Sequence, residues 1–133
     1  MPLQHLNAPD AAPAPPGAKY SHAVQAGPFL YVTGQLPIDP DDLQQPLPEG
    51  IAAQTHLVFK NLTRIVAHGG YGLADTAFVR VYLTAFQRDY PGFNTVYQGY
   101  FPDDAKLPGR TTVGVTGLAR DALVEIDLVL WKG

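Results

Sequence analysis

The spacing of apolar side chains changes along this sequence, and the change limits the folds that the chain can adopt. Over residues 51–66 the core-type positions recur every three or four residues, which is typical of an amphipathic helix: Ile51, Thr55, Val58, Leu62 and Ile65. Gly69-Gly70 follows where a left-handed residue would end this helix. Over residues 76–84 the period becomes two, with Val79, Val81 and Leu83 on one side, which predicts a strand.

The remaining elements follow from local signals. Residues 21–26 and 29–33 are rich in strand formers and flank Gly27-Pro28, which predicts a hairpin. We expect a second helix over 92–101, ended by Pro102, and two last strands over 111–115 and 123–131. The predicted order is ββαβαββ, and 133 residues with 46% hydrophobic content suffice for a single α+β domain.

The predicted strands have two different faces. One is aliphatic and suited to packing under the helices: Leu30, Val32, Val79, Val81, Leu83, Val113, Val115, Val124, Ile126, Leu128 and Leu130. The other is too apolar for open water and too polar for a core: Phe29, Tyr31, Thr33, Phe78, Arg80, Tyr82, Arg110, Thr112, Leu123, Glu125, Asp127 and Trp131. We therefore expect two layers, with both helices on one face of a mixed sheet, and a homo-oligomer that covers the second face.

Two segments are expected to lie outside this regular structure. Residues 1–19 form an arm rich in Ala and Pro, which disfavours helix and sheet, so we expect it to be extended, with order beginning near Tyr20 and the domain proper spanning 20–133. Residues 39–50 contain three prolines and four acidic residues, which predicts an exposed loop.

Composition excludes several classes of function. A net charge of −3 and a pI near 5.7 provide no basic field for nucleic acid or anionic lipid, which argues against both kinds of partner. The absence of cysteine excludes disulfides, thiolate nucleophiles and cysteine metal sites. The sequence shows neither a signal peptide nor an apolar run of membrane-spanning length, so we expect a soluble cytoplasmic protein.

Arg110 and Glu125 are the strongest candidates for chemistry. Each lies in a predicted strand, and if the two strands pair, a guanidinium and a carboxylate share a partly enclosed face. Arg110 can grip a substrate carboxylate with two parallel hydrogen bonds, and Glu125 can transfer protons. The alternative is a structural ion pair of Arg110 with Glu125 or Asp127 across an interface between chains, and the sequence alone leaves both interpretations open.

Other chemistries find little support in the sequence. The four histidines never fall at metal-ligand spacing, so no metal is expected. Ser21 is the only serine and lies outside any nucleophile elbow. Gly69-Gly70-Tyr71-Gly72 follows a helix, which favours a capping role over phosphate binding, and Tyr90, Tyr97 and Tyr100 are interpreted as packing residues.

Several short motifs between Tyr20 and Leu130 carry a family resemblance. They are Tyr20-Ser21-His22-Ala23-Val24, Thr33-Gly34-Gln35, Ala53-Gln54, Gly72-Leu73-Ala74-Asp75, Phe93-Asn94-Thr95-Val96-Tyr97, Pro108-Gly109-Arg110-Thr111-Thr112 and Val124-Glu125-Ile126. Together they resemble the RidA/YjgF family of reactive-intermediate deaminases, historically also labelled translation inhibitor or L-PSP endoribonuclease. The resemblance implies a fold similar to the bacterial chorismate mutase type and a homotrimer with active sites between subunits.

The resemblance also implies roles for individual residues. Arg110 would bind the carboxylate of a 2-imino acid, Glu125 would act on the attacking water, and Tyr20, Thr33 and Asn94 would line the pocket. Thr112 stands where better-studied deaminases often carry cysteine, which bears on substrate preference. The implied reaction is the cofactor-free hydrolysis of 2-imino acids to 2-oxo acids and ammonia. The alternatives are a non-catalytic trimeric binder of small carboxylates and, less well matched to an acidic chain, an endoribonuclease.

Overall fold

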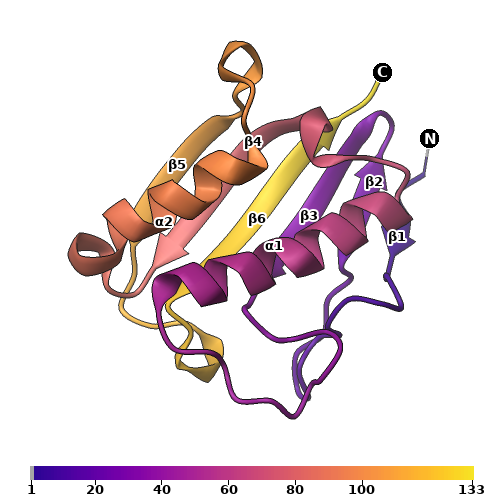
Figure 1. Ribbon diagram of the computed structural model, residues 1–133. Helices are drawn as coiled ribbons and strands as arrows, with labels where there is room; N and C mark the ends of the chain where they lie inside the picture. Colours follow the sequence, from indigo (N-terminus) through magenta and orange to yellow (C-terminus); the bar gives the residue numbers. More distant parts are fainter. Residues whose placement is uncertain (1) are drawn as a thin grey trace.

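A six-stranded mixed sheet carries both α-helices on one of its faces in the computed structural model, which describes residues 2–133 (Figure 1). The strands lie in the order β1-β2-β3-β6-β4-β5. They span Gln4–Leu6 (β1), Ala23–Ala26 (β2), Phe29–Gln35 (β3), Thr76–Leu83 (β4), Gly109–Gly114 (β5) and Val124–Trp131 (β6). Only β4 and β5 run parallel, joined by a helical crossover, and the other neighbours are antiparallel. The predicted α+β architecture with two layers is confirmed.

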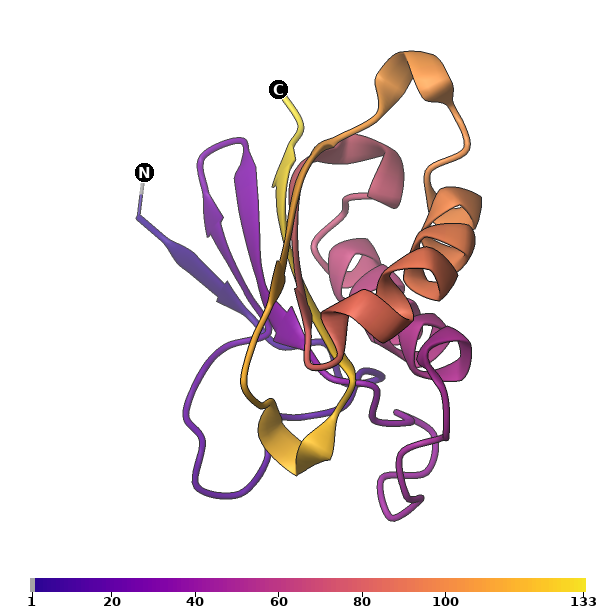
Figure 2. The ribbon, with the colours of Figure 1, turned by 90° about the vertical axis from the view of Figure 1, so that its left-hand side faces the viewer.

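The two helices cover one side of the sheet and leave the other side open (Figure 2). Helix α1 spans Ile51–His68, close to the predicted range, and Gly70 beyond it adopts the left-handed φ of 83° expected of a helix stop. Helix α2 spans Phe86–Tyr100, so the predicted start near Gly92 is wrong. The helix begins before Pro91, where Phe86 stacks on Tyr90 with ring centroids 4.8 Å apart, and it continues through the proline. No helix among residues 2–133 combines the length and the apolar character needed to cross a membrane.

The core lies between this sheet and the helices. The predicted aliphatic face is confirmed for β3, β4 and β6, whose inward side chains are all at most 3% exposed: Leu30, Val32, Val79, Val81, Leu83, Val124, Ile126, Leu128 and Leu130. Helix α1 adds Val58, Phe59, Leu62, Ile65 and Val66, and α2 adds Phe93. This packing holds the strands rigidly, and it therefore fixes where their outward side chains point.

Strand β5 faces the opposite way from the prediction. Its register with β4 pairs Val79 with Arg110 and Val81 with Thr112, and paired residues of neighbouring strands point to the same side. Arg110 and Thr112 therefore lie on the helix side, while Val113 is 39% exposed on the open side. The alternation shows which residues share a face but not which face is buried. At this edge α2 offers polar aromatic and amide groups, which suit a guanidinium better than a valine.

The N-terminal arm is more ordered than predicted. Residues Gln4–Leu6 form β1, which pairs with β2 and adds a strand at the start of the predicted order. Beyond it, Ala8, Ala11 and Ala12 are only 3%, 5% and 6% exposed. The expectation that order begins near Tyr20 is therefore wrong, because small alanine side chains pack closely and side chains of the domain bond the backbone of the arm.

The loop before α1 is exposed over residues 41–46, as predicted. It is nevertheless tied to the helix through Asp41, whose carboxylate lies 2.7 Å from Lys60 Nζ and 2.8 Å from Arg64 Nη1. These two cations hold the pKa of Asp41 well below its usual range.

The open face of the sheet presents large apolar side chains to solvent. Five of them are 38–50% exposed: Phe29, Tyr31, Phe78, Val113 and Trp131. Among them Asp127 accepts hydrogen bonds from Arg80 Nε at 2.8 Å and from the Tyr82 hydroxyl at 2.9 Å. A surface that combines apolar side chains with satisfied polar groups is typical of protein interfaces.

Candidate functional site

Arg110 is held in the groove between β5 and α2. Its Nη2 donates to Asn94 Oδ1 at 2.7 Å and more weakly to the Tyr90 hydroxyl at 3.4 Å. The guanidinium carbon lies 4.7 Å from the centre of the Tyr97 ring, a distance at which a cation is attracted to an aromatic face. Tyr90, Asn94 and Tyr97 come from successive turns of α2, so one helix face orients the guanidinium.

The same groove opens into a cavity of about 720 Å³. It is lined by Asn94, Tyr97, Gln98, Phe101, Pro102, Asp104, Leu107 and Arg110. Across the described chain, no carboxylate lies within 4.0 Å of Arg110, and its Nε and Nη1 have no hydrogen-bond partner. The Tyr97 hydroxyl and Thr112 Oγ1 are buried and likewise have no partner within residues 2–133. We call Arg110, Asn94, Tyr97 and Thr112 the arginine half-site.

Glu125 lies on the open face, over a bulge in β3. The register between β3 and β6 shifts between Val32 and Gln35, and a Cβ placed at Gly34 would overlap the Glu125 carboxylate. Burial, and secondly the nearby charge of Asp127, raise the pKa of Glu125 above its usual 4.5. Glycine at position 34 therefore makes room for a carboxyl group that is half-buried and holds its proton more tightly than usual.

Thr33 and Tyr20 complete this second cluster. Thr33 Oγ1 donates to the Ser21 carbonyl at 2.7 Å, which ties the segment before β2 to the bulge. Burial, and secondly the charge of Glu125, raise the pKa of Tyr20. A depression of about 330 Å³ lined by Thr33, Gly34 and Asp127 opens on the same face. We call Tyr20, Thr33, Gly34 and Glu125 the glutamate half-site.

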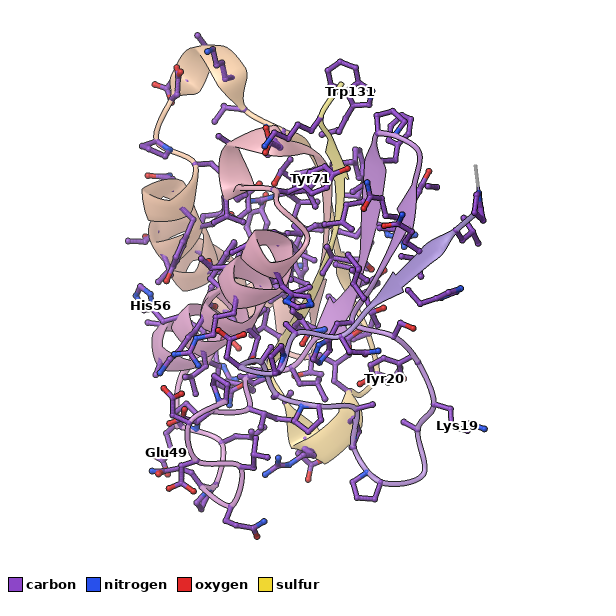
Figure 3. All side chains as sticks on the ribbon, turned by 90° about the vertical axis from the view of Figure 1, so that its right-hand side faces the viewer. Lys19, Tyr20, Glu49, His56, Tyr71 and Trp131 are labelled. Carbon is purple, nitrogen blue, oxygen red and sulfur yellow. The ribbon has the colours of Figure 1, made fainter. Side chains whose placement is uncertain are left out.

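The two half-sites lie on opposite faces of the sheet. Tyr82 pairs with Glu125 on the open face, whereas Val79, buried under the helices, pairs with Arg110. Figure 3 shows Tyr20 on the side of the sheet away from the helices, with His56 of α1 on the other side. The prediction that Arg110 and Glu125 share a face is therefore wrong for a single chain. Within the chain, Asp127 accepts hydrogen bonds from Arg80 and Tyr82 instead of facing Arg110.

Sequence reasoning assigned Tyr97 and Tyr90 to packing and missed their contact with Arg110. The available signal was their spacing around Asn94, which places all three on one helix face. Gly34 was noted only as part of a motif, and its closeness to Glu125 depends on a bulge that the sequence does not reveal. Within residues 2–133, no three His, Asp or Glu side chains gather as they would to hold a metal ion.

Comparison with known proteins gives a consistent result. The sequence model of the family described as Endoribonuclease L-PSP matches residues 10–131. A RutC family protein of Sulfurisphaera tokodaii is 41% identical over 124 residues, which cover 93% of this chain and 95% of that protein. The crystal structure of RidA from an Antarctic Psychrobacter bacterium has a TM-score of 0.87 at 32% identity, with 97% of this chain and 99% of that chain covered. Yeast Mmf1 has a TM-score of 0.88 at 30% identity, with coverage of 99% and 100%.

Proposed function

Because the chain belongs to the Endoribonuclease L-PSP family, which includes proteins named RidA and YjgF, we propose that it hydrolyses 2-imino acids. Its substrates would be of the 2-iminobutanoate and 2-iminopropanoate type, and its products a 2-oxo acid and ammonia. The observation that supports this proposal best is the set of contacts around the Arg110 guanidinium. A guanidinium that opens into a cavity, backed by an aromatic ring and lacking a carboxylate partner among the described residues, is prepared for a carboxylate ligand.

Arg110 would select for the carboxylate of the substrate. Asn94 accepts from one hydrogen of Nη2 and fixes the plane of the group, which leaves a parallel pair of N–H groups, one of them the second N–H of Nη2, to donate to a ligand. A planar donor pair matches the two oxygens of a carboxylate, so binding also orients the neighbouring C=N carbon. The apolar side chains of Phe101 and Leu107 in the same cavity suit the aliphatic part of an amino-acid-derived imine.

Glu125 would handle the protons of the reaction. Addition of water to the C=N carbon forms a C–O bond, and the resulting adduct then loses its nitrogen as ammonia. Glu125 would carry both water protons to the nitrogen, one during addition and one from the hydroxyl of the adduct as the C–N bond breaks and the C=O bond forms, and burial raises its pKa above the usual 4.5. The Tyr20 hydroxyl beside it would hold the water or the nitrogen in place.

The two half-sites would meet between copies of the chain. Since they occupy opposite faces of one sheet, a complete site requires the arginine half-site of one copy to approach the glutamate half-site of another. Such a contact joins two different surfaces of the same protein, and contacts of this type form closed rings when the rotation between copies closes. A homotrimer is the ring that we propose, and the exposed side chains of the open face, including Phe29 and Tyr31, would supply its apolar contacts.

A coupled assay tests the proposal. A pyridoxal-phosphate enzyme that releases a 2-imino acid is combined with this protein, and ammonia is measured over the spontaneous rate. Acceleration that disappears in Arg110→Ala supports the proposal. Pyruvate binding without acceleration would instead make the protein a binder of small carboxylates. RNA cleavage that requires Arg110 would favour the endoribonuclease alternative.

A further inference from the structure

His22 is a buried ring between the N-terminal arm and the hairpin. It is 4% exposed and makes hydrogen bonds through both ring nitrogens. The backbone N–H of Ala8 donates to Nδ1 at 3.0 Å, and Nε2 lies 2.7 Å from the Ala12 carbonyl oxygen. An N–H can only donate and a carbonyl can only accept, so these partners require a neutral ring with its proton on Nε2.

We propose that His22 is a pH-sensitive clamp that positions the glutamate half-site. In its neutral form the ring pins residues 7–12 against the domain, and protonation of Nδ1 releases them. That protonation releases the arm does not depend on the proposed function. The effect of this release on turnover does rest on it.

Beyond β1, three other hydrogen bonds attach residues 7–12 to the domain, and one of them joins Arg64 Nη1 to the Asp10 carbonyl at 2.8 Å. Asn7 Oδ1 accepts from the backbone N–H of His22 at 3.1 Å. Ala12 N–H donates to Asn61 Oδ1 of α1 at 2.8 Å. The His22 ring therefore lies between these two contacts and supplies two more, one at Ala8 and one at Ala12.

The same residue is connected to the glutamate half-site. The His22 carbonyl accepts from the Thr33 N–H at 3.0 Å, and the Ser21 carbonyl accepts from Thr33 Oγ1 at 2.7 Å. Tyr20 and His22 line one cavity of about 520 Å³ together with the arm. The arm held by the His22 ring therefore also walls the cavity that Tyr20 lines, so release of the arm changes the surroundings of Tyr20.

Protonation is incompatible with the observed contacts. An imidazolium donates at both nitrogens, so Nδ1–H would face the Ala8 N–H, and two donors would be left unsatisfied in a buried site. Within the described chain the ring has no ion-pair partner that could compensate its charge. The titratable and charged groups on the surrounding segments are His5, Asp10, Lys19, Tyr20, Asp39, Asp41, Asp42, Lys60 and Arg64. Asp39 and Asp41 are paired with cations of α1, and Arg64 also bonds the Asp10 carbonyl.

His22→Gln provides a matched control. The glutamine side chain offers a carbonyl oxygen to accept from Ala8 and an amide to donate to Ala12, but it does not titrate in the relevant range. Amide hydrogen exchange at Ala8 and Ala12, corrected for intrinsic rates, is compared between pH 8 and pH 5 in both proteins. We expect protection in the wild type to fall by about tenfold or more at the lower pH, as loss of one hydrogen bond implies, and to stay constant in His22→Gln. Equal loss in both proteins, or none in the wild type, would overturn the clamp.

Two further measurements keep the test decisive. Nitrogen NMR of wild-type His22 at pH 8 reports the tautomer directly, so a proton on Nδ1 contradicts the proposal even where His22→Gln fails to fold. In the deaminase assay, the wild type should lose kcat/KM toward acid pH more steeply than His22→Gln does. If no deaminase activity is found at all, the proposed function fails while the exchange data still decide the clamp.

Discussion

Arg110 and Glu125 are attached to strands of one sheet but project from its opposite faces. Arg110 is on the helix side with the ring of Tyr97 against it, and Glu125 is on the open side above Gly34. A rigid sheet cannot bring these two groups together within one chain, so any chemistry that uses both requires a second copy. Variants of either residue and assemblies of mixed chains therefore report separately on each side chain and on the contact that would unite them.

Replacing Arg110 with lysine should nearly abolish deamination and leave assembly intact. An ammonium is a point donor that cannot reproduce a planar pair of hydrogen bonds. Losing one charge-assisted bond should weaken carboxylate binding by about 1.5–3 kcal/mol. Pyruvate titration and the ammonia assay measure the two effects, and light scattering monitors assembly. Wild-type activity in an assembled Arg110→Lys protein would show that Arg110 does not bind the substrate carboxylate.

Mixing two inactive variants should restore activity. In hybrid rings of Arg110→Ala and Glu125→Gln chains, some interfaces combine the intact Arg110 of one copy with the intact Glu125 of another. We expect each variant alone to be inactive, and the mixture, unfolded and refolded together, to recover a fraction of wild-type turnover. The double variant mixed with itself is the control. Recovery that is absent although light scattering shows mixed assemblies would mean that the site does not span two copies.

Periodicity was sufficient to predict most of the fold. Strands β3, β4 and β6 have aliphatic sides that are unambiguous because each is a continuous row of Val, Ile or Leu, and α1 has one apolar stripe and a glycine stop. Strand β5 has only alternating Arg, Thr and Val, so either side could have been the buried one. Its orientation depends on what α2 presents to it, and the start of α2 was itself obscured by Pro91.

The candidate site could be predicted as a set of residues but not as a geometry. The sequence motifs identified six site residues, which the structure divides into two clusters. One cluster contains Arg110, Asn94 and Thr112, and the other contains Glu125, Tyr20 and Thr33. That division follows from strand register, which involves contacts far apart in the chain. The order of the arm was missed for a related reason. Besides the pairing of β1, it depends on hydrogen bonds between the arm backbone and the side chains of His22 and Asn61, which leave no periodic trace in the sequence.

Tyr97 should support Arg110 through its ring and not through its hydroxyl. The hydroxyl is buried without a partner, so Tyr97→Phe should leave the unfolding temperature unchanged or slightly higher. Tyr97→Leu removes the aromatic face beneath the guanidinium and should weaken pyruvate binding a few-fold, the size of a cation–π contact of about 0.5–1 kcal/mol. Circular dichroism controls for folding. Equal pyruvate affinity in the Phe and Leu variants would contradict a role for the ring.

The loop before α1 should loosen in acid because of Asp41. Lys60 and Arg64 lower the pKa of Asp41 in the folded protein, so its stabilising contribution is complete above the ordinary value of 3.8 and is lost as the pH falls through the lowered value. Asp41→Asn should therefore increase hydrogen exchange over residues 39–46 at neutral pH, and high salt should reduce the difference from wild type. A neutral-pH exchange rate equal to that of wild type would show that the ion pairs do not hold the loop.

Glu125→Gln should separate binding from turnover. The amide keeps the size and hydrogen-bonding capacity of the carboxyl group but cannot exchange a proton, so turnover should fall by roughly 10²–10⁴-fold, as is usual for loss of general acid–base catalysis. Pyruvate affinity should survive, because the carboxylate is bound by Arg110. In the wild type, a base at Glu125 must be ionised, so kcat/KM should fall as the pH drops through its pKa, which burial raises above 4.5. This decline should be absent from the residual activity of Glu125→Gln after the spontaneous rate is subtracted. If the variant keeps its turnover and loses its assembly instead, Glu125 is a structural partner at the interface.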